Sequence, residues 1–203
     1  MNTGNSKSSY NIWKTIHLGA LSAERLINQM KWSISGFQDL VGRNVALEIF
    51  LTNSFKMSIT RSQIDLPLVM IPEEELGFKD GVEYQYPEVG RWADKNGLYL
   101  CSPEVGPQLF LQIDHDEKAR GWLWVAMPSI DEAIFGIDHR IDPFRKRFVL
   151  HSTHYGKISA GNNTRYPHYW IFGLKPSINH ELADFNLKLQ LAQEILSRIP
   201  SWK

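Results

Sequence analysis

Residues 108–127 have the sequence QLFLQIDHDEKARGWLWVAM, and the pattern in this stretch decides the predicted fold. Apolar residues alternate with others along 108–113 and again along 122–127, as they do in half-buried strands. A strongly polar segment, 114–121, lies between the two runs. The stretch therefore predicts an antiparallel hairpin with a solvated loop. The predicted core side of this hairpin consists of Leu109, Leu111, Ile113, Leu123, Val125 and Met127.

The flanking segments predict both helices and strands. Ser22 is a good N-cap and Glu24 suits the first turn of a helix, so we expect a helix from there to about Gly36. A second helix is expected from Pro87 to Lys95, because proline is favoured at the first helical position. Further expected elements are strands at 68–71, 148–152 and 168–172, a helical turn at 73–75 and a helix at 177–199. The prediction is an α+β fold, a mostly antiparallel sheet of about five strands with the N- and C-terminal helices packed on it.

The length of 203 residues predicts a single α+β domain over 11–203, preceded by a disordered tail at 1–10 that is rich in Asn and Ser. The predicted helix at 177–199 carries two apolar stripes, which is more than one packing contact requires. The second stripe predicts another packing partner, either a further layer of this chain or a second copy in a homodimer, and we favour the homodimer. This stripe consists of Leu187, Leu191 and Ile195.

The chain carries 22 Lys and Arg and 22 Asp and Glu, so its formal net charge is zero. This balance argues against nucleic acid as a partner, because phosphates are met by clustered positive charge. The single cysteine, Cys101, allows no internal disulfide and predicts a reducing compartment. The N-terminus lacks the apolar core of a signal peptide, and no apolar run reaches the ~20 residues of a membrane span. We therefore expect a soluble, cytoplasmic protein that has no membrane partner.

The segments ELGF at 75–78 and GLYLCSPEVGPQLFLQ at 97–112 form a specific motif. Together with the tryptophan-containing runs at 122–127 and 170–172, they resemble a family of small uncharacterised bacterial proteins, over roughly residues 17–175. The resemblance implies neither an activity nor a catalytic residue. The chain departs from the family pattern at Phe110, where the family has an arginine, and in its longer and more charged loop at 114–121.

Candidate catalytic and metal-binding residues are few. His151 and His154 have an H-x-x-H spacing, but they lie at a predicted strand end and not on one face of a helix. We therefore expect histidines at the surface or hydrogen-bonded in the core, and no bound metal. The other ligands that a zinc or iron site would need could come from His139, His168, Asp138 or Asp142. Cys101 is expected to be a buried thiol, and no glycine pattern predicts a nucleotide cofactor.

Glu104 lies in a stiff turn between Pro103 and Gly106-Pro107, just ahead of the predicted hairpin. Such a turn either presents the carboxylate to a ligand or uses it to cap amides within the turn. The hairpin side opposite the core is too apolar for a fully solvated face. It is either covered by a terminal helix or forms an aromatic platform for a sugar, base or peptide. The ligand-binding hypothesis names Glu104, Gln108, Phe110, Gln112, Trp122 and Trp124.

These residues make a non-catalytic binding or interaction module the leading prediction, with a small-molecule or protein ligand and no cofactor. The alternative is a hydrolase that acts on a glycan or a similar polar substrate, with Glu104 as general acid or base. Such a hydrolase would need a second acid or base close to Glu104 in space. The surroundings of this one carboxyl group therefore separate the two predictions.

Overall fold

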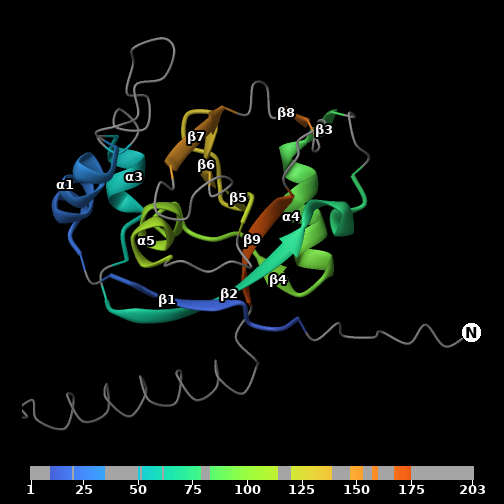
Figure 1. The fold of residues 1–203 in the computed structure, drawn as a ribbon, viewed down its shortest axis with the longest axis horizontal. Coiled ribbons are helices and arrows are strands. Elements are labelled where there is room, and N and C mark those ends of the chain that lie inside the picture. Colours follow the sequence, from blue (N-terminus) through green and yellow to red (C-terminus); the bar gives the residue numbers. More distant parts are fainter. Residues whose placement is uncertain are drawn as a thin grey trace, which may run out of the picture.

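The computed structural model describes residues 10–19, 21–34, 50, 52–60, 62–78, 83–113, 120–138, 147–152, 157–159 and 167–174. Helices and strands are mixed along the chain (Figure 1), and the predicted α+β class is confirmed. In chain order the elements are β1 (Lys14–Leu18), α1 (Ala23–Ile34), α3 (Asn53–Met57), β2 (Ile64–Pro72), η1 (Glu73–Leu76), β3 (Glu83–Gln85), α4 (Tyr86–Lys95), β4 (Leu98–Tyr99), α5 (Val105–Gln112), β5 (Trp122–Val125), β6 (Ala133–Asp138), β7 (Arg147–Ser152), β8 (Lys157–Ser159) and β9 (His168–Leu174).

Seven of the described strands form one sheet. Its order is β1-β2-β9-β5-β6-β7, and β4 pairs with β9 beside this path. Neighbouring strands are antiparallel except β5 and β9, which run parallel. The remaining two described strands, β3 and β8, pair with each other. The prediction of a mostly antiparallel sheet is therefore confirmed, with more strands than expected.

Several elements follow the sequence signals closely. The Ser22 carbonyl accepts the Leu26 N–H at 2.9 Å, so α1 begins where the N-cap predicts. Helix α4 carries Pro87 in its first turn and has Asn96 as its C-cap. The prediction of a strand at 68–71 is confirmed by β2, and η1, β7 and β9 cover the other expected turn and strands. At these positions, local signals such as helix caps and prolines were sufficient to predict the elements.

The prediction of a first hairpin strand at 108–113 is wrong, because residues 105–112 form helix α5. Pro107 lies in the first turn of this helix, where an N–H has no intrahelical acceptor, so the proline costs little. The Ile113 N–H donates to the Leu109 carbonyl at 2.7 Å and closes the last turn. The second predicted strand exists as β5, but it pairs with β6 and β9 and not with 108–113.

The sheet carries helices on both faces (Figure 1). A Cβ on Gly106 of α5 would lie 2.7 Å from the Cβ of Phe135, so Phe135 faces α5. The next residue in β6, Gly136, faces the other way, because successive strand residues point to opposite faces. A Cβ on Gly136 would lie 2.5 Å from the ring of Trp124. Helix α5 and the Trp124 indole therefore lie on opposite faces of the sheet.

Helix α4 packs on the face that carries Trp124. The ring of Tyr86 lies 6.0 Å from that of Trp170, and the ring of Trp92 lies 5.5 Å from that of Phe172. Trp170 is in register with Trp124 on the neighbouring strand, so the two side chains share a face. Buried side chains occupy both faces, and among them Phe50, Phe55 and Phe135 form an aromatic cluster on the α5 side.

Some predictions fall on residues outside the described part of the chain. These are the C-terminal helix at 177–199 with Leu187, Leu191 and Ile195, the tail at 1–9, residues 114–119 of the predicted hairpin loop, and the candidate metal ligands His139, Asp142 and His154. The ring of Tyr10, where the tail was expected to end, lies 6.4 Å from that of Trp92. Within the described ranges, no helix has the length and apolar character that crossing a membrane requires.

Candidate binding site

Three of the predicted ligand-binding residues form a polar ladder along one face of α5. Glu104, Gln108 and Gln112 are spaced by four residues, which places them above one another on a helix. The Gln108 amide donates to Glu104 at 3.3 Å, and the Gln112 amide donates to the Gln108 oxygen at 3.0 Å. This spacing, and not strand alternation, explains why the two glutamines face the same way.

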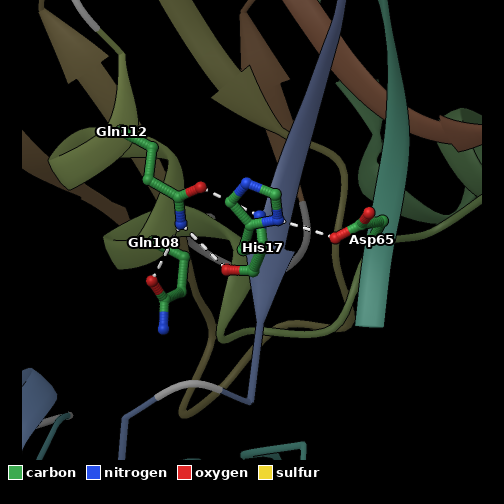
Figure 2. Close-up of polar contacts among 4 residues, drawn as sticks. All are labelled: His17, Asp65, Gln108 and Gln112. Atoms are coloured by element: carbon green, nitrogen blue, oxygen red, sulfur yellow. Dashed lines mark hydrogen bonds and ion pairs between the residues drawn. The ribbon is translucent and has the colours of Figure 1, made fainter. Parts of the chain in front are cut away.

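The ladder ends on strand β1 at His17 (Figure 2). The Gln112 side chain accepts the His17 N–H at 2.8 Å and donates to the His17 carbonyl at 2.9 Å. The His17 ring turns away from this contact, toward Asp65, with Nδ1 2.6 Å from the carboxylate. Both of these side chains are largely exposed, at 64% and 71%. An exposed ion pair of this kind contributes little to stability.

At its other end the ladder terminates in Glu104, which is fully buried. Its carboxylate accepts the backbone N–H of Gly19 at 2.9 Å and that of Thr60 at 2.6 Å, in addition to the Gln108 amide. Glu104 therefore neither faces solvent nor caps its own turn, but holds together two loops that are distant in sequence. A general acid or base has to reach its substrate, so this geometry favours a structural role for Glu104.

An open cleft lies beside the two loops that Glu104 holds. Its volume is about 710 Å³, and Gly19 and Thr60 contribute to its wall. The N–H groups of Gly19 and Thr60 are already bonded to Glu104, so these two groups are not available to a ligand in the cleft. The remaining lining residues are Leu21, Ser22, Ala23, Lys56, Met57 and Ile59.

The sheet divides the six residues of the ligand-binding hypothesis. Glu104, at the N-cap of α5, and Gln108, within α5, are both buried, and Phe110 of the same helix packs into the core with 3% of its surface exposed. Trp122 and Trp124 lie on the opposite face, as the in-register contact of Trp124 with Gly136 requires. The six residues therefore do not form one surface.

The two tryptophans form a stack on β5. Their ring centroids are 5.1 Å apart and their planes differ by 14°. Trp124 is buried, with 8% of its surface exposed, and its ring lies over the backbone of Gly136. Trp122 is partly buried and keeps some accessible surface. Trp124 therefore supports the Trp122 indole from one side, and solvent can reach part of Trp122.

A histidine and a buried carboxylate lie beside this stack. His168 is within 6.5 Å of both indoles, measured between ring centroids. Its Nδ1 is 3.4 Å from Glu73, and the two side chains are only 13% and 7% exposed. Glu73 also accepts the Tyr84 hydroxyl at 2.9 Å and the Trp170 indole N–H at 3.4 Å. Three partners thus satisfy a carboxylate that would otherwise be costly to bury.

The electrostatic effect of Glu73 is visible at Tyr84. Burial, and next the negative charge of Glu73, raise the pKa of the Tyr84 hydroxyl far above its usual range. Tyr84 therefore stays a hydrogen-bond donor at any physiological pH. The ring of Phe78 stacks on Tyr84 at 3.7 Å and keeps it in place.

Strand register aligns the polar neighbours of Trp122. Asp138 is its partner on β6, and His168 is its partner on β9. In-register residues point to the same face, so the three side chains form a row, here called the Trp122 row. The neighbouring strands are each ~4.8 Å away, which separates the backbones at Asp138 and His168 by about 10 Å. An acceptor and an imidazole therefore flank one partly exposed indole.

Sequence reasoning did not combine Asp138, His168 and Glu73 with the tryptophans. The alternation along 168–172 places His168 on the same face as Trp170, which is a usable local signal. The parallel pairing of β5 with β9 has no such signal, and only this pairing brings His168 beside Trp122. Among the residues described, no group of three His, Cys, Asp or Glu side chains could hold a metal ion.

Comparison of the sequence with protein-family models and curated proteins, and with solved structures, finds no match. The function therefore has to be argued from the site itself.

Proposed function

We propose that this protein is a non-catalytic, cytoplasmic binding module whose ligand is a small polar molecule with a flat face that stacks on Trp122. The observation that carries the proposal is the Trp122 row, in which a partly exposed indole lies between Asp138 and His168. A few polar groups placed around an apolar surface are typical of ligand sites. The cytoplasmic location rests on the single cysteine, Cys101, which is fully buried.

The rigidity of the row supports binding. Trp124 fixes the plane of Trp122 from one side, and Gly136 allows Trp124 to lie close to the sheet. Glu73 holds His168 through Nδ1, and Glu73 is itself held by Tyr84 and Trp170. A site whose side chains are already ordered loses less entropy when a ligand binds.

The hydrolase alternative receives less support from the geometry. Glu104 has no exposed surface, and its carboxylate accepts three hydrogen bonds from Gly19, Thr60 and Gln108. None of these partners is an acid or a base, whereas glycoside hydrolysis needs two carboxyl groups on either side of the scissile bond.

The test first identifies a ligand and then compares alanine variants of two histidines, His168 and His17, each of which lies beside a carboxylate. Saturation-transfer NMR against a panel of sugars, nucleobases, amino acids and dipeptides would identify ligands of the wild-type protein. We expect His168→Ala to weaken binding of the ligand about tenfold or more, since 1.4 kcal/mol corresponds to a factor of ten. His17→Ala is the matched control, because His17 is exposed and lies on β1, three strands away from Trp122 on β5 in the sheet order.

Two results would contradict the proposal. One is a panel in which no compound shows binding that depends on Trp122 or His168. The other is equal loss of binding in His168→Ala and His17→Ala at unchanged thermal midpoint, which would place the ligand elsewhere.

A further inference from the structure

The open cleft beside Glu104 lies apart from the Trp122 row and has no part in the proposed function. Its described lining comes from two segments, 19–23, which leads from β1 into α1, and 56–60, at the end of α3. The volume of about 710 Å³ lies within the range of small-molecule sites. None of the described lining residues belongs to β5, β6 or β9, the strands of the Trp122 row. A ligand in the cleft would therefore bind independently of that row.

The two segments that line the cleft are fixed in place. Glu104 bonds to both of them, through the N–H of Gly19 at 2.9 Å and the N–H of Thr60 at 2.6 Å. The α3 segment is also anchored by Phe55, which is fully buried and whose ring lies 4.9 Å from that of Phe50. Walls that are already ordered reduce the entropy lost when a ligand binds.

Half of the described lining is apolar, and consists of Leu21, Ala23, Met57 and Ile59. Met57 leaves 79% of its surface exposed, the largest value among the exposed apolar side chains described. Contact with a hydrocarbon would remove this side chain and its apolar neighbours from water, which is favourable. Methionine is unbranched and polarisable, so it adapts its shape to a flexible chain. The cleft therefore suits a ligand with an aliphatic part.

Lys56 carries the only formal charge among the lining residues that the structure describes. It is exposed, and it forms no ion pair with any other described residue. An ammonium group only donates hydrogen bonds. The hydroxyl oxygen of Ser22 accepts the Arg25 N–H at 3.4 Å, so its proton is left for a ligand. The polar groups of the cleft therefore call for a hydrogen-bond acceptor, and Lys56 favours one that is negatively charged.

Two carboxylates near the cleft decide where a negative group can lie. Glu104 is fully buried, and its charge is met by the donors at Gly19 and Thr60. Glu24 is exposed in the first turn of α1, outside the described lining, and is followed by the oppositely charged Arg25. Repulsion by Glu104 disfavours an anion against the Gly19 and Thr60 walls. An anionic group is thus best placed at Lys56, with the aliphatic part of the ligand filling the rest of the cleft.

We propose that this cleft binds a free linear monocarboxylate, a fatty acid, whose carboxylate pairs with Lys56 while its hydrocarbon chain lies against Leu21, Met57 and Ile59. The proposal adds a second binding site to the protein and does not depend on the ligand of the Trp122 row. Glu104 acts in it as a positioning residue that holds the two walls together.

The experiment titrates the full chain with octanoate, 1-octanol, octylammonium and acetate by calorimetry, each below the concentration at which it forms micelles or separates. Octanoate should bind more tightly than the neutral and cationic compounds of equal chain length, and acetate should not bind. Lys56→Gln should weaken octanoate binding about fivefold, as loss of an exposed ion pair does, and leave octanol unchanged. Met57→Ser should weaken both about fivefold, because it removes apolar contact.

Lys95→Gln is the matched control, because Lys95 is also an exposed lysine in the last turn of a helix, but in α4 and outside the described lining. Thermal midpoints show whether each variant is folded, and substitutions at exposed positions such as 56, 57 and 95 should change them little. In ¹³C-methyl spectra the Met57 signal, identified by its loss in Met57→Ser, should shift as octanoate is added.

Three results would overturn the proposal. Equal affinity for octanoate and octanol, or an effect of Lys56→Gln no larger than that of Lys95→Gln, removes the role of the carboxylate. Octanoate binding that Met57→Ser leaves unchanged, with an unshifted Met57 methyl signal, places the chain outside the cleft. Absence of octanoate binding rejects the site itself. Each of these outcomes leaves the proposed function at Trp122 standing, since the two sites share no described residue.

Discussion

The six-membered ring of Trp124 lies over Gly136, its cross-strand partner, so closely that a Cβ on the glycine would be 2.5 Å from Cε3 and Cζ3 of the indole. The ring cannot move outward freely, because Trp122 stacks on it at 5.1 Å. The glycine is thus required by the ring above it and not by its own backbone conformation. The pair links the core of the sheet to the accessible indole of the Trp122 row.

Gly136→Ala is expected to destabilise the protein by about 1–3 kcal/mol, because the added methyl group overpacks a fixed ring. The matched control is Gly90→Ala in α4, where the nearest atom to the new Cβ, in Leu100, is 3.6 Å away. That change should stabilise by about 0.5–1 kcal/mol, since alanine is the better helix former. Urea denaturation midpoints of the two variants measure the difference. A destabilisation of equal size in both would show that the Trp124 contact is not the cause.

Trp124→Ala is expected to cost roughly 3–5 kcal/mol, as emptying a buried aromatic site does. Trp122→Ala should cost less, because Trp122 already keeps part of its surface accessible. The free energy of unfolding from chemical denaturation separates the two variants. If Trp124→Ala were nearly neutral, the stack would not be part of the core, and Trp124 would have to be considered a ligand-contacting residue.

Glu104→Gln is expected to destabilise by about 2–3 kcal/mol, although the two side chains have almost the same shape. The carboxylate accepts N–H groups at both oxygens, whereas glutamine would direct an NH₂ group at one of these donors. Gln112→Glu is a useful comparison, because Gln112 is only partly buried and uses both its donor and its acceptor at His17. Denaturation should give a clearly larger loss for Glu104→Gln than for an exposed change such as Asp65→Asn. A neutral Glu104→Gln would contradict the anchoring role.

Alkaline pH is expected to destabilise the protein, with part of the effect coming from Cys101. Burial raises the pKa of its thiol to about 12, from an ordinary value of 9.0. Between these values the unfolded chain releases a proton that the folded chain retains, so rising pH favours unfolding. Stability should thus be constant with respect to this group below about pH 9 and fall above it. The urea midpoint of Cys101→Ala, measured from pH 8 to 10, should fall less steeply than that of the wild type; parallel slopes would refute this assignment.

Local signals in the sequence predicted α1, α4, β2 and β5 because their determinants lie within a few residues. Pro87 and Asn96 bound α4, and Trp122 to Val125 alternate as the strand requires. Residues 108–113 were mispredicted because an alternation of six residues also fits a helix, in which Leu109, Phe110 and Ile113 are buried. The bonds that engage the polar side of this helix come from His17, Gly19 and Thr60. Contacts so distant in sequence leave no local pattern.

The candidate site was predicted only in part, because some of its contacts also come from segments that are distant in sequence. Trp122 and Trp124 were identified from their own segment, where the alternation correctly placed them on one face. Their polar partners come from β6, β9 and η1, and the order of strands in the sheet decides which of them become neighbours. Glu104 was chosen because its turn is stiff, but the fold uses that stiffness to direct the carboxylate inward.

The bonds between Gln112 and His17 have a consequence for association between molecules. Among the described strands, β1 lies at one end of the sheet, and an end strand offers backbone groups on which a foreign strand can grow. The Gln112 amide occupies both groups of His17 and takes the place of a neighbouring peptide unit. An incoming strand would have to break two hydrogen bonds before it could pair there. Gln112 thus protects this edge against intermolecular sheet growth. It does so from a helix, where the sequence pattern predicted a strand.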